Sequence, residues 1–396
     1  MSSDTPWYTS WRALLDRKLG SQEIEFSEAP DELIGGNRLT LLHDGRQAYP
    51  AMLAAIAGAQ STIHLETYIL SSDRTGWRFA SLLAEKARCA VEVRVIFDSV
   101  GSLGIAPGYL QFLRNNGVSL LEYRPVAPWR QRWGWGRRDH RKILVVDTSI
   151  GFAGGINISD EYAAPAEGGG GWRDTDMRIE GPAAYELDRI FRQTWFKETG
   201  RWFGLEGYPD KAIGASVVRV AANQEFLHRH RIRRAFLRNL RRAKREVSIA
   251  NAYFIPDPAI QRALRAASRR GVRVRVLVPG RSDVPAAAYA GRYCYESLLR
   301  HGVRIYEWPY QMLHSKTVVI DGIWSVVGSY NMDHRSLLHD LEVNIHVIDH
   351  DFGRQMEEAF GQDIALAQEI ILDLWRRRSW REKVIEQIFY SIRYWL

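Results

Sequence analysis

The chain has 396 residues, of which 46% are hydrophobic and 25% charged, so it can bury a large core without covalent support. It contains only two cysteines, Cys89 and Cys294, which argues against a disulfide framework and indicates a reducing compartment. The formal net charge of +8 suits a partner rich in phosphate but does not separate lipid from nucleic acid.

The N-terminal segment is predicted to be amphipathic over residues 1–34. A helix there would place Trp7, Trp11, Leu14 and Leu15 on or near one side. Residues 1–30 hold no signal-peptide core, and nowhere does the chain reach the run of about 18 apolar residues that a membrane span needs. We therefore expect no membrane span, and a lipid substrate would have to be approached from the cytoplasm by a peripheral protein.

Strand-like segments of the first half of the chain return in the second half. The repeated pairs are 61–70 with 247–255, 91–97 with 272–278, and 115–125 with 300–310. Helical stretches at 76–88 and 258–270 lie between these β-rich segments. Alternating helices and strands indicate an α/β protein with a mixed sheet in each half.

The repeats predict the domain organisation. We expect two tandem α-β-α sandwich halves, 35–197 and 226–362, related by a pseudo-two-fold axis with one shared active site. Residues 198–225 hold five glycine or proline residues and are predicted to be an irregular linker. Residues 363–396 are predicted to form an amphipathic helical tail.

One short motif also occurs twice. The first copy is His140-x-Lys142-x4-Asp147, and the second is His314-x-Lys316-x4-Asp321. Each Asp is followed ten residues later by an asparagine, Asn157 in the first copy and Asn331 in the second.

The residue types of this motif suit phosphoryl chemistry. In an extended segment, residues i and i+2 point to the same face, so each histidine and lysine face the same way. Histidine supplies a nucleophile or an acid–base group near neutral pH, lysine a positive charge, and asparagine an amide donor. A single His-x-Lys on a strand is usually a surface pair. Two copies with matching Asp and Asn make that explanation improbable, and we interpret them as two halves of one site.

These residues resemble the signature of the phospholipase D superfamily, His-x-Lys-x4-Asp with a trailing Gly-[Gly/Ser]-x-Asn, and both copies match every signature position. The segments 250–254 and 271–278 are most similar to short bacterial cardiolipin synthases. The similarity covers roughly residues 35–360.

The resemblance implies a role for each motif residue. His140 would attack phosphorus to form a phosphohistidine, and His314 would act as general acid and then general base. Lys142, Lys316, Asn157 and Asn331 would hold the phosphate oxygens. Asp147 and Asp321 would tie down the motif loops rather than touch phosphate.

Each histidine also needs an acceptor for its other ring nitrogen. Glu342 lies 28 residues after His314, and Asp176 occupies the parallel place after the glycine-rich stretch 167–171. The resemblance implies that these acids cross between the halves, Glu342 to His140 and Asp176 to His314. An ordinary surface carboxylate is the alternative for each.

Three segments combine cationic and apolar residues. Segment 228–246 has Ile232, Phe236 and Leu240 at helical spacing, which indicates a packed helix with a basic outer face. Segments 128–140 and 375–396 interleave arginine with tryptophan, a mixture that suits a bilayer interface but can also stack on single-stranded nucleic acid. Their members are Trp129, Trp133, Trp135, Arg130, Arg132, Arg137 and Arg138, and then Trp380, Val384, Ile388, Ile392 and Trp395. The last helix could instead simply dock on the protein's own core.

The function predicted from these features is phosphatidyl transfer between two phosphatidylglycerol molecules at the cytoplasmic face of a bacterial membrane. The expected partner is an anionic phospholipid membrane containing phosphatidylglycerol and cardiolipin, with no obligatory nucleic acid. No cofactor or metal is expected, because the sequence lacks metal-ligand spacings. The alternatives are a phospholipase or phosphodiesterase nuclease with the same residues, and an inactive binding module.

Overall fold

The computed structural model describes residues 21–26, 32–127, 129, 136–204, 212–223 and 230–395. The predicted residues Trp7, Trp11, Leu14 and Leu15, and the segment Arg130–Trp135, lie outside the described residues. The described part of the chain contains no helix that combines the length and apolar character needed to cross a bilayer.

The first half begins on a long strand and alternates strands with helices. After α2 (Ser21–Phe26) its elements are β1 (Ile34–His43), α3 (Asp44–Gly58), β2 (Thr62–Thr67), α4 (Arg74–Arg88), β3 (Glu92–Asp98), α5 (Pro107–Asn115), β4 (Ser119–Tyr123), β5 (Ile143–Val146), β6 (Ile150–Gly154), the short helix η2 (Pro165–Glu167), β7 (Thr175–Glu180) and α6 (Pro182–Thr199).

The second half repeats this order. Its elements are β8 (Ser216–Ala222), α7 (Arg231–Arg242), β9 (Glu246–Asn251), α8 (Pro258–Arg269), β10 (Arg273–Pro279), α9 (Pro285–Leu299), β11 (Arg304–Trp308), β12 (Lys316–Ile320), β13 (Trp324–Gly328), α10 (His334–Leu338), β14 (Val343–Ile348) and α11 (His350–Leu366). The tail adds β15 (Gln368–Glu369), α12 (Leu372–Arg376), α13 (Trp380–Ser391) and η3 (Arg393–Trp395).

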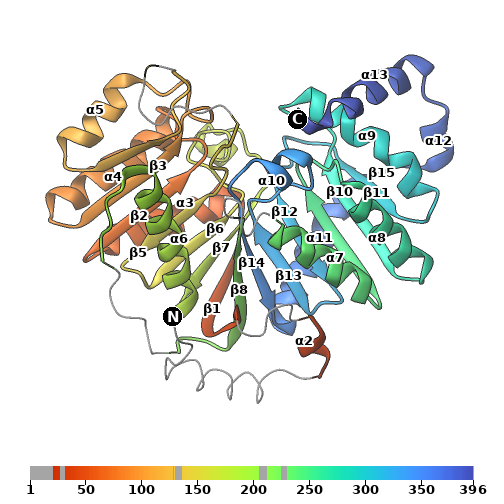
Figure 1. Ribbon diagram of the computed structural model, residues 1–396, viewed down its shortest axis with the longest axis horizontal. Coiled ribbons are helices and arrows are strands. Elements are labelled where there is room, and N and C mark those ends of the chain that lie inside the picture. Colours follow the sequence, from red (N-terminus) through yellow and green to blue (C-terminus); the bar gives the residue numbers. More distant parts are fainter. Residues whose placement is uncertain are drawn as a thin grey trace.

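All described strands belong to one mixed sheet with the order β15-β11-β10-β9-β12-β13-β14-β8-β1-β7-β6-β5-β2-β3-β4. The order is nearly the same when read from either end, as expected for two copies of one unit. Figure 1 shows the halves side by side, with β1 and β8 at the centre. The α/β class and the two repeated halves are therefore confirmed, although their sheets are joined into one.

The predicted linker 198–225 differs from the structure, because it contains β8. This strand pairs antiparallel with β14 on one side and β1 on the other, for example Val218 with Val347 and with Ile34. The glycines around it suggested irregular chain, but the mostly apolar residues of 216–222 form a strand at the centre of the sheet.

Three apolar clusters form most of the core, one centred on each half and one between the halves. Helices α3, α4 and α5 pack on the first half and α7, α8 and α9 on the second, where Ile232, Phe236 and Leu240 are buried as predicted. A third cluster joins β5–β7 of the first half to β12–β14 of the second, and it includes Leu187 of α6 and Phe352 of α11. Because this core is shared, the halves cannot separate without exposing apolar surface.

Candidate active site

The two motif histidines lie where β5 and β12 begin. Since β5 runs antiparallel to β2 and β12 to β9, these starts meet the carboxyl ends of β2 and β9. Ligands of α/β sheets commonly bind at such strand ends. His140, Lys142, His314 and Lys316 are all buried, with 3–8% of each residue exposed.

Short backbone bridges join the halves next to each histidine. The His140 amide donates to Leu341 O at 3.0 Å, and Leu341 N donates to Arg138 O at 2.9 Å. In the same way, His314 N donates to Arg173 O at 2.7 Å, and Arg173 N donates to Met312 O at 2.9 Å. Leu341 and Arg173 directly precede an acid, so each bridge brings an acid of one half to the histidine of the other.

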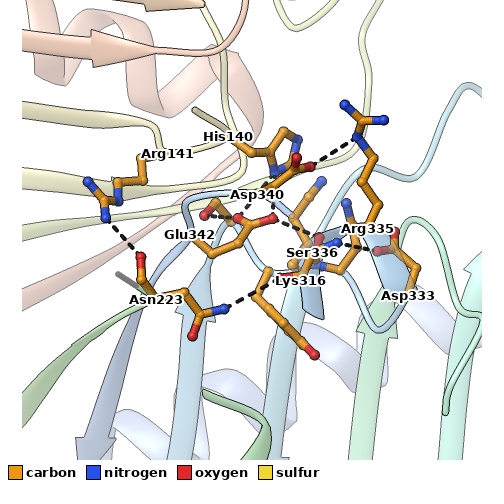
Figure 2. Close-up of polar contacts among 12 residues, drawn as sticks. His140, Arg141, Asn223, Lys316, Asp333, Arg335, Ser336, Asp340 and Glu342 are labelled. Carbon is orange, nitrogen blue, oxygen red and sulfur yellow. Dashed lines mark hydrogen bonds and ion pairs between the residues drawn. The ribbon is translucent and has the colours of Figure 1, made fainter. Parts of the chain in front are cut away.

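The acid beside His140 is Glu342, from the second half. Its carboxylate oxygens lie 3.1 and 3.2 Å from His140 Nδ1 (Figure 2). Two hydroxyls hold the same carboxylate, since Ser336 Oγ donates to Oε1 at 2.7 Å and Ser329 Oγ donates to Oε2. A carboxylate at Nδ1 favours the proton on that nitrogen, which leaves the Nε2 lone pair for chemistry.

The acid beside His314 is Asp174, and the prediction of Asp176 was wrong. Asp174 Oδ2 lies 2.8 Å from His314 Nδ1. Asp176 is buried within β7, where it pairs with Gly154, and its Oδ1 accepts a hydrogen bond from Met177 N.

Strand register explains the correction. Gly154 pairs with Asp176 in the first half, and Gly328 pairs with Asn344 in the second. Asp176 therefore corresponds to Asn344, and the counterpart of Glu342 lies two residues earlier, at Asp174. The common pattern of an acid followed two residues later by Asp or Asn was visible in the sequence. The unknown length of the glycine-rich insertion hid it.

The second position of the Gly-[Gly/Ser] pair serves the two acids differently. In the second half it is Ser329, which donates to Glu342. In the first half it is Gly155, where a Cβ would collide with the Asp174 carboxylate. The smaller residue thus leaves room for the acid, while the serine reaches it with a hydroxyl.

Burial and mutual repulsion lower the pKa values of the basic groups in the site. Burial lowers the pKa of Lys142 to about 7 and that of Lys316 to about 8. Burial, followed by Lys142, Lys316 and His314, holds the pKa of His140 well below its usual value. His140 is therefore neutral at pH 7. Lys142 of its own half and Lys316 of the other half both contribute to its lowered pKa.

The two acids differ in charge. Burial and then the neighbouring Asp340 raise the pKa of Glu342 well above its usual value. Burial also opposes ionisation of Asp174, but Lys316 and His314 together overcome it and lower the pKa of that carboxyl. His314 consequently lies beside the better-ionised acid.

Asp147 and Asp321 lie at the far ends of the motif hairpins. Asp147 accepts the amides of Gln60, Ser61 and Thr62 at 2.8–2.9 Å. Asp321 accepts those of Lys244, Arg245 and Glu246, each at 2.8 Å. Seven residues of extended chain, roughly 20 Å, separate each Asp from its histidine, so neither is placed to touch the same phosphate.

The two motif asparagines have different surroundings. Asn157 Oδ1 accepts from Ile69 N at 3.0 Å, and its Nδ2 donates to Tyr162 Oη at 2.7 Å. That hydroxyl lies 3.2 Å from His314 Nδ1. Asn331 is also buried, and its Oδ1 has no hydrogen-bond partner among the described residues.

A groove of about 390 Å³ opens beside His314. Its lining includes Trp172, Arg281, Asp283 and Tyr310. The Trp172 ring lies 5.6 Å from the His314 ring, and Tyr253, 6.2 Å from the same ring, donates to Asp283 at 2.8 Å. An anionic group and hydroxyls can therefore be recognised within reach of the second histidine.

Among the residues that the structure describes, no three His, Cys, Asp or Glu side chains are grouped in a way that could hold a metal ion.

Comparisons with known proteins agree with the duplicated site. The profile of the family described as cardiolipin synthase, PLD-like domain, matches residues 52–195 and 236–364. A cardiolipin synthase of Geobacillus kaustophilus is 34% identical over 89% of this chain and 71% of its own length. One from Staphylococcus aureus is 32% identical over 87% of this chain and 70% of its own length.

Solved structures share the fold at low identity. A phosphatidylserine synthase of Haemophilus influenzae superposes with a TM-score of 0.66 and 14% identity, covering 90% of this chain and 95% of its own. A polyphosphate kinase of Porphyromonas gingivalis gives a TM-score of 0.53 and 15% identity, covering 82% of this chain and 50% of its own. Because the family profile spans both motif halves and the relatives align over most of the chain, this protein belongs to the PLD-like cardiolipin synthases, enzymes of the phospholipase D superfamily.

Proposed function

We propose that the protein makes cardiolipin and glycerol from two molecules of phosphatidylglycerol. In the first step a histidine forms a bond to phosphorus and the bond to the glycerol headgroup breaks. In the second step a hydroxyl of another phosphatidylglycerol forms a bond to the phosphorus of the phosphohistidine. The phosphorus–nitrogen bond then breaks, which gives cardiolipin and the free histidine. One observation carries the proposal: each motif histidine contacts an acid of the opposite half, which builds a single site with two histidines.

His140 is the proposed nucleophile and His314 the proposed general acid and base. A nucleophile must be neutral, and burial with surrounding cations holds the pKa of His140 well below its usual value. A general acid must hold a proton: burial and Lys316 lower the pKa of His314, and the ionised Asp174 beside it opposes that shift. Glu342 and Asp174 are positioning residues in this mechanism.

Lys142, Lys316, Asn157 and Asn331 are the proposed phosphate-binding groups. Both lysines are buried next to the histidines, where an incoming phosphodiester would replace lost hydration and favour their charged form. Because these donors can offset the phosphate charge, the mechanism needs no metal ion.

The groove beside His314 is the proposed acceptor site. Arg281 suits the acceptor's phosphate, because a guanidinium pairs well with phosphate oxygens, and Asp283 suits its glycerol hydroxyls. Delivery of an alcohol to the histidine that deprotonates it would favour transfer over hydrolysis.

The proposed setting is the cytoplasmic face of a bacterial membrane, with the protein bound peripherally to anionic phospholipid. Trp129, just before the first motif, is 86% exposed, which supports contact with an interface. Arg138 from the same segment is fully buried and hydrogen-bonds Ser99 and the Arg124 carbonyl, so it does not contribute to such a surface.

The test uses headgroup-labelled and phosphate-labelled phosphatidylglycerol vesicles. We expect labelled cardiolipin and free glycerol, together with acid-labile phosphate on the protein that is absent in His140→Ala. If the protein-bound label persists in His140→Ala but is lost in His314→Ala, then His314 is the nucleophile and His140 is the general acid and base. Phosphatidic acid as the main product would favour a phospholipase, and cleavage of single-stranded DNA without lipid turnover would favour a nuclease.

A further inference from the structure

The last helix carries an apolar stripe that faces away from the protein. Its members recur about every four residues and are largely exposed, namely Trp380 at 71%, Val384 at 47%, Ile388 at 55%, Ile392 at 45% and Trp395 at 76%. Leu374 on the preceding α12 is also 63% exposed. Solvent exposure of so many large apolar side chains in one stretch marks an interaction surface.

The opposite face of α13 already packs on the protein. Phe389 stacks on Tyr289 with ring centroids 5.7 Å apart, and Tyr390 stacks on Tyr293 at 4.2 Å. Glu386 of the same helix is also buried and pairs with Arg378. The helix is therefore fixed on α9 (Figure 1). The predicted stripe is the face that this docking leaves exposed.

The C-terminal end of the stripe lies next to α10, a helix that contributes to the active site. The η3 turn packs on α10, where the Tyr394 ring meets the His339 ring at 5.1 Å. Within α10, Ser336 donates to Glu342, which contacts His140. A surface bound to the stripe would thus lie next to the helix whose Ser336 holds Glu342 beside His140.

Cations accompany the stripe. Arg376, Arg377, Arg381 and Lys383 are exposed on α12, α13 and the turn between them, and residues 371–396 hold six basic and three acidic residues. Tryptophans stand at both ends, with aliphatic residues between them. Such a segment matches a bilayer interface, where tryptophan occupies the headgroup level and lysine and arginine contact anionic lipid.

We propose that this face, Leu374 to Trp395, seats the enzyme on an anionic phospholipid surface with the active site turned toward the headgroups. The inference rests on the proposed function in one respect, since it takes the site's substrate to be a membrane lipid. Charge complementarity selects lipid over a second copy of the chain, which would bring the same cations face to face.

The experiment compares two double variants of the full chain on α13. Val384→Glu/Ile388→Glu places two charges in the stripe. Gln387→Glu/Ser391→Glu adds the same charge at exposed positions of the same helix without removing an apolar side chain. Binding is measured by flotation with vesicles of phosphatidylglycerol and phosphatidylcholine, and with phosphatidylcholine alone, while light scattering after size exclusion gives the oligomeric state.

We expect the stripe variant to lose on the order of tenfold in partition to the anionic vesicles, and the control variant to lose much less. In the stripe variant, turnover on vesicles relative to turnover of dispersed short-chain phosphatidylglycerol should fall together with vesicle binding. Equal binding by both variants would overturn the proposal, as would a wild-type dimer that the stripe variant converts to monomer with unchanged vesicle binding. Stripe-dependent binding without cardiolipin formation would leave this inference standing and refute the proposed reaction.

Discussion

The identity of the acid beside each motif histidine can be tested by single-atom changes. We predict that Asp174→Asn lowers kcat on the order of 10²-fold or more, because an amide cannot stabilise the charged imidazole of His314. Asp176→Asn is a matched control two residues further along the chain, in β7. Burial raises the pKa of Asp176 well above its usual value, so an uncharged amide replaces it with little loss.

Steady-state kinetics and circular dichroism on both variants check this prediction. The acid-labile phosphate on His140 should still form in Asp174→Asn when the leaving group is good, since that variant impairs proton transfer rather than attack. A larger loss of kcat in Asp176→Asn than in Asp174→Asn would contradict the assignment.

The two buried lysines predict how activity depends on pH. Their pKa values of about 7 and about 8 mean that the free site loses positive charge as the pH rises through this range. We expect kcat/KM for an anionic phosphodiester to fall on the alkaline side, while kcat falls at higher pH because bound phosphate favours the protonated lysines. Lys142→Arg, which stays charged, should move the alkaline limb of kcat/KM upward even if activity drops. An unchanged limb would mean that another group titrates.

Chelator should not abolish the reaction. The proposed Lys and Asn donors would offset the phosphate charge, so we predict turnover of a soluble phosphodiester in EDTA at the rate seen without it. The soluble substrate avoids effects of metal ions on vesicle packing. A complete loss that one divalent metal restores would contradict the metal-free mechanism.

At the scale of elements, the hairpins β5–β6 and β12–β13 present the motif and are each tied to a neighbouring strand by an aspartate. Burial alone would raise the pKa of Asp147, but the amides of Thr62, Ser61 and Gln60 outweigh it and lower the pKa. This ionised carboxylate therefore stabilises the fold at neutral pH.

We predict that Asp147→Ala lowers the free energy of unfolding by about 2–3 kcal/mol, because three amides lose a charged acceptor. The difference from wild type should be full above the unfolded pKa of about 4 and should shrink as the pH falls through the lower folded pKa. Urea unfolding at several pH values measures it, and Asp321→Ala provides the repeat in the other half. A loss of activity with no loss of stability would instead indicate a direct catalytic role.

At the scale of the whole molecule, the exchange of acids across the halves makes the site a property of one complete chain. We predict that a mixture of His140→Ala and His314→Ala proteins stays inactive, since each chain lacks one of the two histidines that its own site needs. Co-expression of the two variants is the control for slow exchange. Activity restored by mixing would show that the site forms between two chains.

The sequence by itself determined the superfamily and the two-half architecture. The doubled His-x-Lys-x4-Asp motif and the repeated strand segments were sufficient to predict two α/β halves, one shared site and the superfamily. Glu342 was also found from the sequence, because no insertion separates it from its motif. These features are local, and spacing along one strand and turn fixes which side chains share a face.

Only the tertiary structure decided the features that depend on pairing between distant segments. The glycine-rich insertion changed the offset between His140 and the acid of its own half, which contacts His314, and strand register then selected Asp174 over Asp176. β8 belongs to the continuous sheet because it pairs with β1 and β14. The glycines that flank it in the sequence suggested irregular chain, so this strand was not predicted. The exposed side of α13 was likewise undetermined, because an amphipathic pattern fixes a helix's apolar face but not whether that face meets the core or another surface.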